Sequence, residues 1–560
     1  MANAPGAPAN PSASSLELDA HLEAHLEAHL EAHLEADVLV LGGGPAGTWA
    51  AIAAATAGAR TVLADKGFCG TSGATAASGT TLWYVDPDPA KRAAAKAARE
   101  GLGGHLADHG WMDRVLDRTH AAVGQLADWG YPFPRDADGR DRRVSVQGPE
   151  YMRLMRRRVK QAGVTILDHC PALELLVDDG GAVAGAAGVR RQKGGGWTVR
   201  AKAVVIATGG CAFLSKALGC NVLTGDGLLM AAEAGADLSG MEFSNAYAIA
   251  PAFGSVTKTL LYQWASFTRA DGEVIPGAAS KGGRSVIARV LATEPVYARL
   301  DRAEPELWAA MRQAQPNFFL PFDRVGIDPF TQRFPVTLRL EGTVRGTGGL
   351  RLVNERCATA VPGLFAAGDA ATREPICGGF TGGGSHNAAW AMSSGHWAGQ
   401  GAADHARALG NGARNLRRAG GAGLREGRGR AIDAAALTRA VQAEVFPYHI
   451  NYFRTEEGLT GALDRLDRLW SDAAGAAPSP ADGSLRVREA AAMLATARWM
   501  YRSALARTES RGMHRRLDHA ALDPAQRHLL TVGGLDEVHV SARPAPLHPD
   551  PSGAKRELAA

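Results

Sequence analysis

Glycines and a proline follow directly on an apolar run near the start of the chain. The run is DVLVL, Asp37 to Leu41, and the residues after it include Gly42, Gly44, Pro45, Ala46 and Gly47. An apolar run of this length predicts a buried strand, and glycines after it allow a tight turn and a close approach of backbone to a ligand. Proline suits the first turn of a helix, whose free N–H groups and dipole attract phosphate. The stretch therefore predicts a pyrophosphate-binding turn.

An acidic residue stands where a dinucleotide site requires one. The next apolar run, ARTVLADK, ends in Asp65 and Lys66, about 20 residues beyond the glycines. A carboxylate at this place can accept hydrogen bonds from ribose hydroxyls. The alternative is a glycine-rich turn between strand and helix that holds no ligand. Because strand, helix and acid are all in their expected places, nucleotide binding is the favoured interpretation.

Two later stretches repeat the pattern of a strand that runs into small residues. AKAVVIATGG ends in Ala207, Thr208, Gly209 and Gly210, and VPGLFAAGDAA contains Gly368 and Asp369. Parallel strands end at one edge of a sheet, so segments far apart in sequence can line one extended ligand. With the first turn, these stretches resemble the three FAD-binding segments of flavoproteins that have two dinucleotide-binding domains. In this resemblance Asp369 binds the ribityl or pyrophosphate region.

Further stretches resemble the succinate dehydrogenase and fumarate reductase flavoprotein family. They are TGDGLLMAAEAGADLSGMEF, residues 224–243, GTGGLRLVNERCATAVPGLFAAGDAA, residues 346–371, and LARTESRGMHRRLDH, residues 505–519. The resemblance implies an α/β fold in which an FAD-binding Rossmann-like domain is interrupted by a capping domain and followed by a C-terminal helical domain. Since buried charges need partners, Arg507, Glu509, Arg511 and His514 are expected to form a network that fixes the helical domain to the FAD-binding domain.

The changes in composition along the chain give the expected domain boundaries. They are a disordered tail and a His-Leu-Glu-Ala repeat helix at 1–36, FAD-binding domain at 37–240 and 341–400, capping domain at 241–340, linker or frayed helix at 401–431, helical domain at 432–530 and tail at 531–560.

The resemblance implies that FAD is held without a covalent bond. Family members with a covalent flavin use a His in the loop after the second strand, and here that loop, KGFCGTSGATAASGTTLW, has none. Cys69 in the loop has no second Cys nearby in sequence, which argues against a disulfide reductase. Besides the residues named above, the expected cofactor contacts are Thr71, Ser72, Gly73, Ala74, Thr75, Ala172, Thr224, Asp226, Asn387 and Ala388.

The groups that bind dicarboxylates in this family are missing from their expected places. No Arg-Gly-Glu-Gly stands between 241 and 340, Val344 occupies the position of a His, and the stretch ICGGFTGGGSHNAAWAMSSG after Asp369 has no Arg. Arg is the natural bidentate clamp for a carboxylate. The sequence therefore argues against a succinate-like substrate and against an L-aspartate oxidase.

The same region resembles more closely the α subunit of adenylylsulfate reductase. That resemblance rests on GGFTGGGSHNAAWAMSSG and AFGSVTKTLLYQWASFTRADGE, and it implies catalytic roles for His386, Trp264 and Arg269. Each has another interpretation: His386 as the cap of a helix, Trp264 as a core side chain and Arg269 as a solvated residue of a turn. In a catalytic role, His386 is expected to act as an acid–base or anion-binding group.

These features predict an FAD-dependent oxidoreductase that passes electrons between a small substrate, such as a sulfur compound, and an iron–sulfur protein. The six cysteines include no C-x-x-C pair, so the iron–sulfur centre is expected on a small ferredoxin-like partner. Two alternatives stay open: an adenylylsulfate reductase α subunit proper, and a flavin-binding protein that has lost catalysis.

The overall composition excludes several other classes of function. A formal net charge of +4 over 560 residues gives no reason to expect nucleic acid. No window is apolar enough for a membrane span and no secretory signal is visible, so a cytoplasmic protein is expected. His21, His25, His29 and His33 are spaced i, i+4, which could clamp a metal, but a four-residue period drifts around a helix. A solvated repeat helix without metal is the favoured interpretation.

Overall fold

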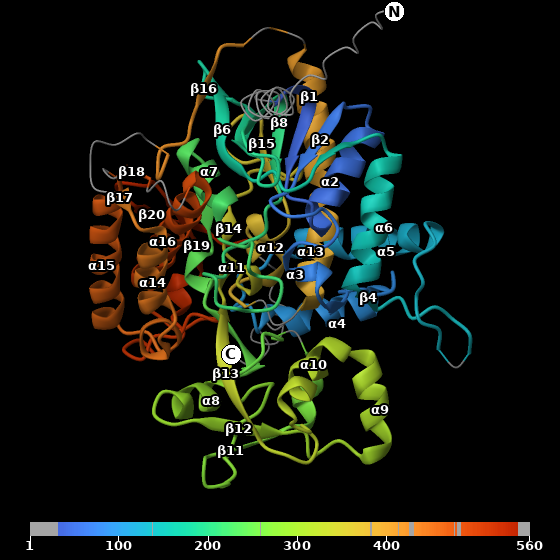
Figure 1. Ribbon diagram of the computed structural model, residues 1–560, viewed down its shortest axis with the longest axis vertical. Helices are drawn as coiled ribbons and strands as arrows, with labels where there is room; N and C mark the ends of the chain where they lie inside the picture. Colours follow the sequence, from blue (N-terminus) through green and yellow to red (C-terminus); the bar gives the residue numbers. More distant parts are fainter. Residues whose placement is uncertain are drawn as a thin grey trace, which may run out of the picture.

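The computed structural model describes residues 32–546, except 137, 258, 381–383, 411, 413, 425–430, 475–476 and 479–482. Figure 1 shows a central sheet with helices beside it, a cap built on β10–β13 at one end, and the helices α14–α16 along one side. Among the helices of the described residues, none has the length and apolar character needed to cross a membrane.

The main sheet has eight strands, and its parallel part carries the predicted turns. The parallel strands are β1 (Ala32–Leu41), β2 (Thr61–Ala64), β5 (Thr165–Leu167), β8 (Gly196–Ile206) and β15 (Leu364–Ala366). The antiparallel extension is β6 (Ala172–Asp178), β7 (Val183–Val189) and β16 (Leu416–Arg418). Val38, Leu39 and Val40 are fully buried, as expected for a strand covered on both faces. The carboxyl ends of β1, β2, β8 and β15 meet at one edge.

Two helices, α2 (Pro45–Thr56) and α13 (Gly384–Leu409), pack against one another beside this sheet. Glycines in α13 make the approach close, since a Cβ at Gly395 or Gly399 would collide with the backbone oxygen of Ala46 or Ala50. This packing places the middle of α13, around Gly395, beside the first glycine turn, and the N-terminal turns of α13 extend beyond it. Helix α13 continues through residues 401–409, so the segment interpreted as a linker or frayed helix begins as ordered helix.

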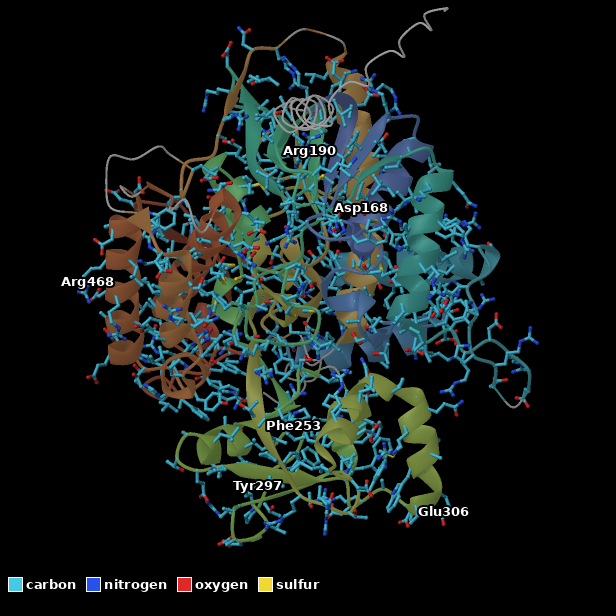
Figure 2. The ribbon with its side chains drawn as sticks, viewed as in Figure 1. Asp168, Arg190, Phe253, Tyr297, Glu306 and Arg468 are labelled. Carbon is cyan, nitrogen blue, oxygen red and sulfur yellow. The ribbon has the colours of Figure 1, made fainter. Side chains whose placement is uncertain are left out.

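The predicted capping region forms a four-stranded antiparallel sheet with an aromatic core. Its strands are β10 (Ala246–Pro251), β13 (Phe334–Glu341), β12 (Val296–Arg299) and β11 (Ser266–Thr268), and its helices are α8 (Arg284–Leu291), α9 (Pro305–Ala314) and α10 (Pro316–Val325). Phe322 and Phe334 stack edge to face with ring centroids 4.6 Å apart. Figure 2 labels Phe253 and Tyr297 in this region. The aromatic residues that made the sequence look irregular therefore form the core of the cap.

The C-terminal region combines helices with a second small sheet. The helices are α14 (Ala434–Val445), α15 (Glu456–Ala474) and α16 (Gly483–Ala506), and the sheet runs β14 (Gly349–Leu350), β9 (Leu238–Ser239), β19 (His528–Gly533) and β20 (His539–Pro544). The hairpin β19–β20 lies across the boundary drawn between the helical domain and the tail at 531. Because β19 pairs with β9, this part of the predicted tail is ordered structure.

The remaining elements are short or connect these regions. They are α3 (Gly73–Ala76), α4 (Pro89–Glu100), α5 (His109–Asp128), α6 (Gly148–Gln161), α7 (Asp226–Glu233), α11 (Gly342–Arg345), α12 (Glu374–Cys377), β3 (Gly79–Thr81), β4 (Ser145–Gln147), β17 (Ala431–Ile432), β18 (Ala477–Pro478), the 3₁₀ helices η1 (Met241–Phe243), η2 (Leu261–Trp264), η3 (Gly368–Ala370) and η5 (Pro524–Gln526), and the π-helix η4 (Tyr448–Tyr452).

The end of the His repeat differs from the expected helix. Strand β1 begins at Ala32, and its first residues pair in parallel with β8, Ala32 opposite Trp197 and Ala36 opposite Ala201. This pairing satisfies backbone groups that a free helix end would leave open. The residues His21, His25 and His29 lie outside the described part of the chain.

A buried charge network joins the helical region to the rest of the molecule. Arg507 lies 2.9 Å from Glu242 of η1 and 2.9 Å from Glu509, and Arg511 lies 2.6 Å from Glu509. All four side chains are at most 2% exposed. Burial raises the pKa of Glu242, and the guanidinium of Arg507 opposes that rise. His514 closes the network through a contact of 2.7 Å with Arg454. The predicted network is therefore present.

Replacing Arg507 with Met should destabilise the protein strongly, because Glu242 then stays buried without the cation that pairs with it. The expected loss in free energy of unfolding is about 3–5 kcal/mol, measured by urea denaturation. Arg502→Met is the matched control, since Arg502 pairs with Asp467 in an exposed position and should cost below about 1 kcal/mol. Equal losses in the two variants would contradict the structural role of the network.

Candidate active site at the carboxyl edge of the sheet

The first glycine turn has glycines of two kinds. Gly42 has φ +108°, and a Cβ there would collide with the backbone oxygen of Ala207; a Cβ at Gly47 would collide with the oxygen of Gly42. Gly44 has φ −74°, and a Cβ there would meet no atom within 4 Å. Protein packing therefore requires Gly42 and Gly47, whereas Gly44 borders open space. That space lies at the N-terminus of α2, where no side chain caps the free N–H groups and no acid stands in the first turn.

Asp65 holds the first two turns together. Its carboxylate accepts hydrogen bonds from the N–H of Gly43 at 2.5 Å, the N–H of Gly67 at 2.7 Å and the hydroxyl of Ser72 at 2.7 Å. The backbone oxygen of Asp65 accepts from the N–H of Cys170 at 2.7 Å, just before Ala172 opens β6. The acid is thus beside the glycine turn, at the place where a ribose would lie.

Three residues predicted to touch the cofactor bond to one another. Lys66 Nζ donates to the Thr224 hydroxyl at 2.8 Å and to Asp226 at 2.6 Å, and it lies 2.7 Å from Glu489 of α16. Burial alone would lower the pKa of Lys66, but Asp226 and Glu489 outweigh it and raise that pKa. This network ties the second turn to the helical region, and direct cofactor contact by Lys66, Thr224 and Asp226 stays a prediction.

The loop after β2 places small residues beside the glycine turn. Gly73 has φ +85°, a Cβ there would meet no atom within 4 Å, and Ala74, Thr75 and the rest of α3 follow it. Thr71 donates to the Phe68 oxygen at 3.4 Å. The N–H of Cys69 donates to Asp168, which Figure 2 labels, at 2.8 Å. Burial and the nearby Asp65 raise the pKa of the Cys69 thiol to about 12, so it is not a thiolate nucleophile.

The second and third segments are joined through α11, the short helix that follows the strand returning from the cap. The N–H of Cys211, next to Gly209 and Gly210, donates to the Thr343 hydroxyl at 2.7 Å. Asp369 accepts from Arg373 at 2.5 Å, and the fully buried Arg373 also donates to the Thr343 oxygen at 3.0 Å. The backbone of Gly368 is held by side chains of α13. All three predicted segments therefore meet at one edge of the sheet.

His386 stands in the first turn of α13, among aromatic and polar groups. Its ring centroid is 4.5 Å from that of Trp83, and its Nδ1 lies 3.2 Å from the Ser385 hydroxyl. The adjacent Asn387 donates to the Val344 oxygen at 2.9 Å, and Ala388 follows in the helix. Burial, and then the charge of Arg99, lower the pKa of His386 to about 3. His386 is therefore neutral at physiological pH, which favours a hydrogen-bonding role over that of a proton donor.

Two of the predicted catalytic residues lie elsewhere. Arg269 follows β11 and forms ion pairs with Glu294 and Glu273, the latter at 3.8 Å. Figure 1 shows β11 at the end of the cap away from the main sheet. Trp264 ends η2, packs partly buried against the core, and its oxygen accepts from the N–H of Arg302. The structure does not bring these two residues together with His386, and their surroundings favour the turn and core interpretations.

Two arginines that the motifs did not reveal lie where the cap joins the sheet. Arg284 begins α8, donates to the backbone oxygens of Ser280 and Tyr247, and stays accessible to solvent. Partial desolvation and the charge of Arg345 lower its pKa. Arg345 lies 3.6 Å from Glu341 and directly follows Val344, the residue that Asn387 contacts. Glu341 thus pairs with Arg345, and the second guanidinium, that of Arg284, bonds to backbone oxygens and has no ion pair among the described residues.

Comparisons with known proteins agree with this arrangement. The model of an FAD binding domain matches residues 37–251, and that of a fumarate reductase flavoprotein C-terminal domain matches residues 442–546. The chain is an FAD-dependent oxidoreductase that carries both of these domains.

Individual relatives are distant. An L-aspartate oxidase of Caulobacter vibrioides is 28% identical over 89% of this chain and 96% of its own length. Another, of Streptomyces coelicolor, is 27% identical over 60% of this chain and 63% of its own length. A subunit of the fumarate reductase (CoM/CoB) of Methanothermobacter marburgensis is 26% identical over 87% of this chain and 95% of its own.

Solved structures share the fold. E. coli quinol fumarate reductase matches with a TM-score of 0.77 at 22% identity, covering 93% of this flavoprotein and 98% of that chain. Adenylylsulfate reductase of Archaeoglobus fulgidus matches with a TM-score of 0.73 at 20% identity, covering 92% and 96%. The predicted fold class is confirmed, and both families named from the sequence have this fold.

The residues of the flavoprotein fit FAD. The open space at Gly44 and the uncapped N-terminus of α2 suit a pyrophosphate. The Thr208 hydroxyl is buried and has no hydrogen-bond partner among the described residues. The motifs did not point to Trp83, Arg99, Arg284 and Arg345, although Trp83 ends the quoted loop after the second strand and Arg345 directly follows Val344. Beyond this, their only signal in the sequence is the presence of arginine and tryptophan in otherwise apolar or small-residue stretches.

Replacing Gly44 with Val should abolish cofactor binding without unfolding the chain, because the new side chain fills the space for the pyrophosphate. The variant should purify colourless with a normal circular dichroism spectrum. Gly124→Val in α5 is the matched control, since a Cβ there also meets no atom within 4 Å, and it should stay yellow. A yellow Gly44→Val protein with full flavin content would show that the pyrophosphate does not lie there.

The free energy of unfolding should decrease as the pH is lowered, and His386 should account for part of this decrease. Its pKa is about 3 when folded against 6.5 ordinarily, so between these values the unfolded chain binds a proton that the folded chain does not. Stability is therefore lost as the pH falls through this window, at up to about 1.4 kcal/mol per pH unit. In His386→Asn, urea denaturation between pH 6.5 and 4 should show a shallower loss than in the wild type. Parallel curves would contradict the buried, neutral state.

Proposed function

We propose that this flavoprotein oxidises or reduces a small anionic substrate under the cap and exchanges electrons with a separate iron–sulfur protein. The observation that carries the proposal is the excess of positive charge where the cap meets the sheet. Arg345 lies 3.6 Å from Glu341, whose carboxylate also accepts from the Thr257 hydroxyl at 2.8 Å, and the charge of the exposed Arg284 adds to that of Arg345. An anion placed there would balance the second guanidinium.

Each part of the proposed site would have its own role. FAD supplies two-electron transfer at its isoalloxazine when it is bound. The N-terminus of α13 brings Asn387 and a neutral His386 to the substrate, and the cap brings Arg284 and Arg345 from the other side. When the Ser385 hydroxyl donates to Nδ1, Nε2 of His386 carries its proton and can donate a hydrogen bond. Closure of the cap would exclude water from these groups.

The substrate class is an oxyanion, either of a sulfur acid or of a carboxylic acid. Dicarboxylates were disfavoured because two arginines and a His are missing at the family's positions, and Arg99, Arg284 and Arg345 from other elements could take the place of those arginines. The aspartate oxidase and fumarate reductase names of the relatives favour a carboxylate. The resemblance of the α13 region to adenylylsulfate reductase favours a sulfur compound, with the α subunit of that enzyme as the specific form of this alternative.

An iron–sulfur partner is supported by the chain's own cysteines and by its relatives. All six cysteines are buried and free of disulfides. They include no C-x-x-C pair that would suit a cluster. Two relatives are named as subunits of larger enzymes, a fumarate reductase flavoprotein subunit of Mycobacterium tuberculosis and the CoM/CoB fumarate reductase subunit. We propose a small ferredoxin-like protein as the partner of this chain.

A redox screen under anaerobic conditions tests the proposal. The oxidised protein is mixed with sulfite plus AMP or with L-aspartate, and the photoreduced protein with fumarate or with 2-oxo acids. We expect one of these anions to reduce or reoxidise the flavin within minutes, with neutral analogues such as fumaramide inactive. If no anion changes the redox state or the spectrum, the chain is a flavin-binding protein without this catalysis.

A further inference from the structure

Arg99 is a buried cation for which the described part of the chain provides no anion. It lies one residue before the end of α4 and is 4% exposed. Its Nε and Nη2 atoms are buried, and neither has a hydrogen-bond partner among the described residues. The neighbouring acid, Glu100, lies 3.0 Å from His109 and 3.7 Å from His105 instead. An unpaired buried guanidinium is costly, so such a group calls for an anionic ligand.

The surroundings of Arg99 place it at the substrate side of α13. Its Cζ lies 5.7 Å from the ring centroid of Phe380, in the loop that leads into α13. Its charge also acts on His386 in the first turn of that helix, whose Nε2 is buried without a partner among the described residues. Two unsatisfied donors from different elements, one charged and one neutral, therefore face the same region.

The backbone around Arg99 is held in place before any ligand arrives. The N–H of Gly379 donates to the Gly103 oxygen at 2.8 Å, and the N–H of Asp108 donates to the Pro375 oxygen at 2.7 Å. A Cβ at Gly103 would collide with the backbone oxygen of Cys377. These contacts lock the turn after α4 onto α12 and Gly379, so the guanidinium is positioned in advance.

Phe380, the residue under Arg99, belongs to the stretch in which dicarboxylate relatives carry an Arg and this chain carries none. Residues 376–395 read ICGGFTGGGSHNAAWAMSSG. We propose that Arg99, together with Nε2 of His386, binds the anionic group of the substrate and replaces the missing arginine from a different element. This inference rests on the proposed function, and it adds that the substrate carries an oxyanion directed toward α4.

Thermal melting of the FAD-loaded protein tests the role of Arg99, with sulfite and fumarate as separate probes. Each anion that binds should raise the melting temperature of the wild type and perturb the flavin spectrum. In Arg99→Met the apparent dissociation constant should rise about ten- to a hundredfold, as expected for losing a charge-assisted hydrogen bond. The anion-free variant should melt at or above the wild-type temperature, because an uncompensated charge has been removed.

Two further variants separate the alternatives. Arg92→Met on the same helix is the matched control, since Arg92 already pairs with Asp117, and it should keep wild-type anion binding. Arg99→Lys keeps the charge and should retain part of the affinity. Equal anion binding by wild type and Arg99→Met, with turnover intact, would overturn this inference and leave the proposed function standing. Absence of any anion effect on the wild type would overturn both.

Discussion

At the carboxyl edge of the main sheet, glycines allow the backbones of neighbouring elements to lie in direct contact. The rest of the site depends on these contacts. Gly42 lies against Ala207, Gly47 lies against Gly42, and Gly395 of α13 lies against Ala46 of α2. A methyl group at any of these glycines would push two elements apart. Because the contacts are made, the N-terminus of α2 and the middle of α13 are both close to the ends of β1, β8 and β15.

Buried polar and charged side chains then hold together the segments that glycine packing alone does not join. Asp65 joins the first two turns through three hydrogen bonds, and Arg373 joins the third segment to α11, which follows the strand returning from the cap. Lys66 extends the connection to α16 through Glu489. The cofactor edge, the cap and the helical region are therefore tied by paired charges, whereas the charges that face the proposed substrate are left in excess.

The sequence predicted those parts of the molecule that short-range patterns encode. Strand, glycine and acid follow one another within 30 residues around Gly42 and Asp65, so periodicity and turn chemistry located the cofactor edge. Arg99 and Trp83 could not be found this way, since only tertiary packing brings the Trp83 ring to His386 and lets the charge of Arg99 act on it. The β19–β20 hairpin was missed for the same reason, because β19 depends on pairing with the distant β9.

The electrostatic state of His386 shapes the chemical interpretation. Burial and the charge of Arg99 hold the pKa of His386 at about 3, so its imidazole stays neutral across the physiological pH range and would bind the proposed anion by donating a hydrogen bond. Arg269 and Trp264, chosen by position in a motif, have partners of their own in the cap and core. The buried donors without partners, those of Arg99 and His386, therefore identify the proposed substrate site better than the motif positions of Arg269 and Trp264 do.

The central claim is that separate strand ends hold one FAD without a covalent bond, and the visible spectrum of the purified chain tests it most directly. The account predicts flavin absorbance near one FAD per chain, with all of the flavin found in the supernatant after acid precipitation. A colourless chain that takes up no FAD on refolding with it would contradict the account.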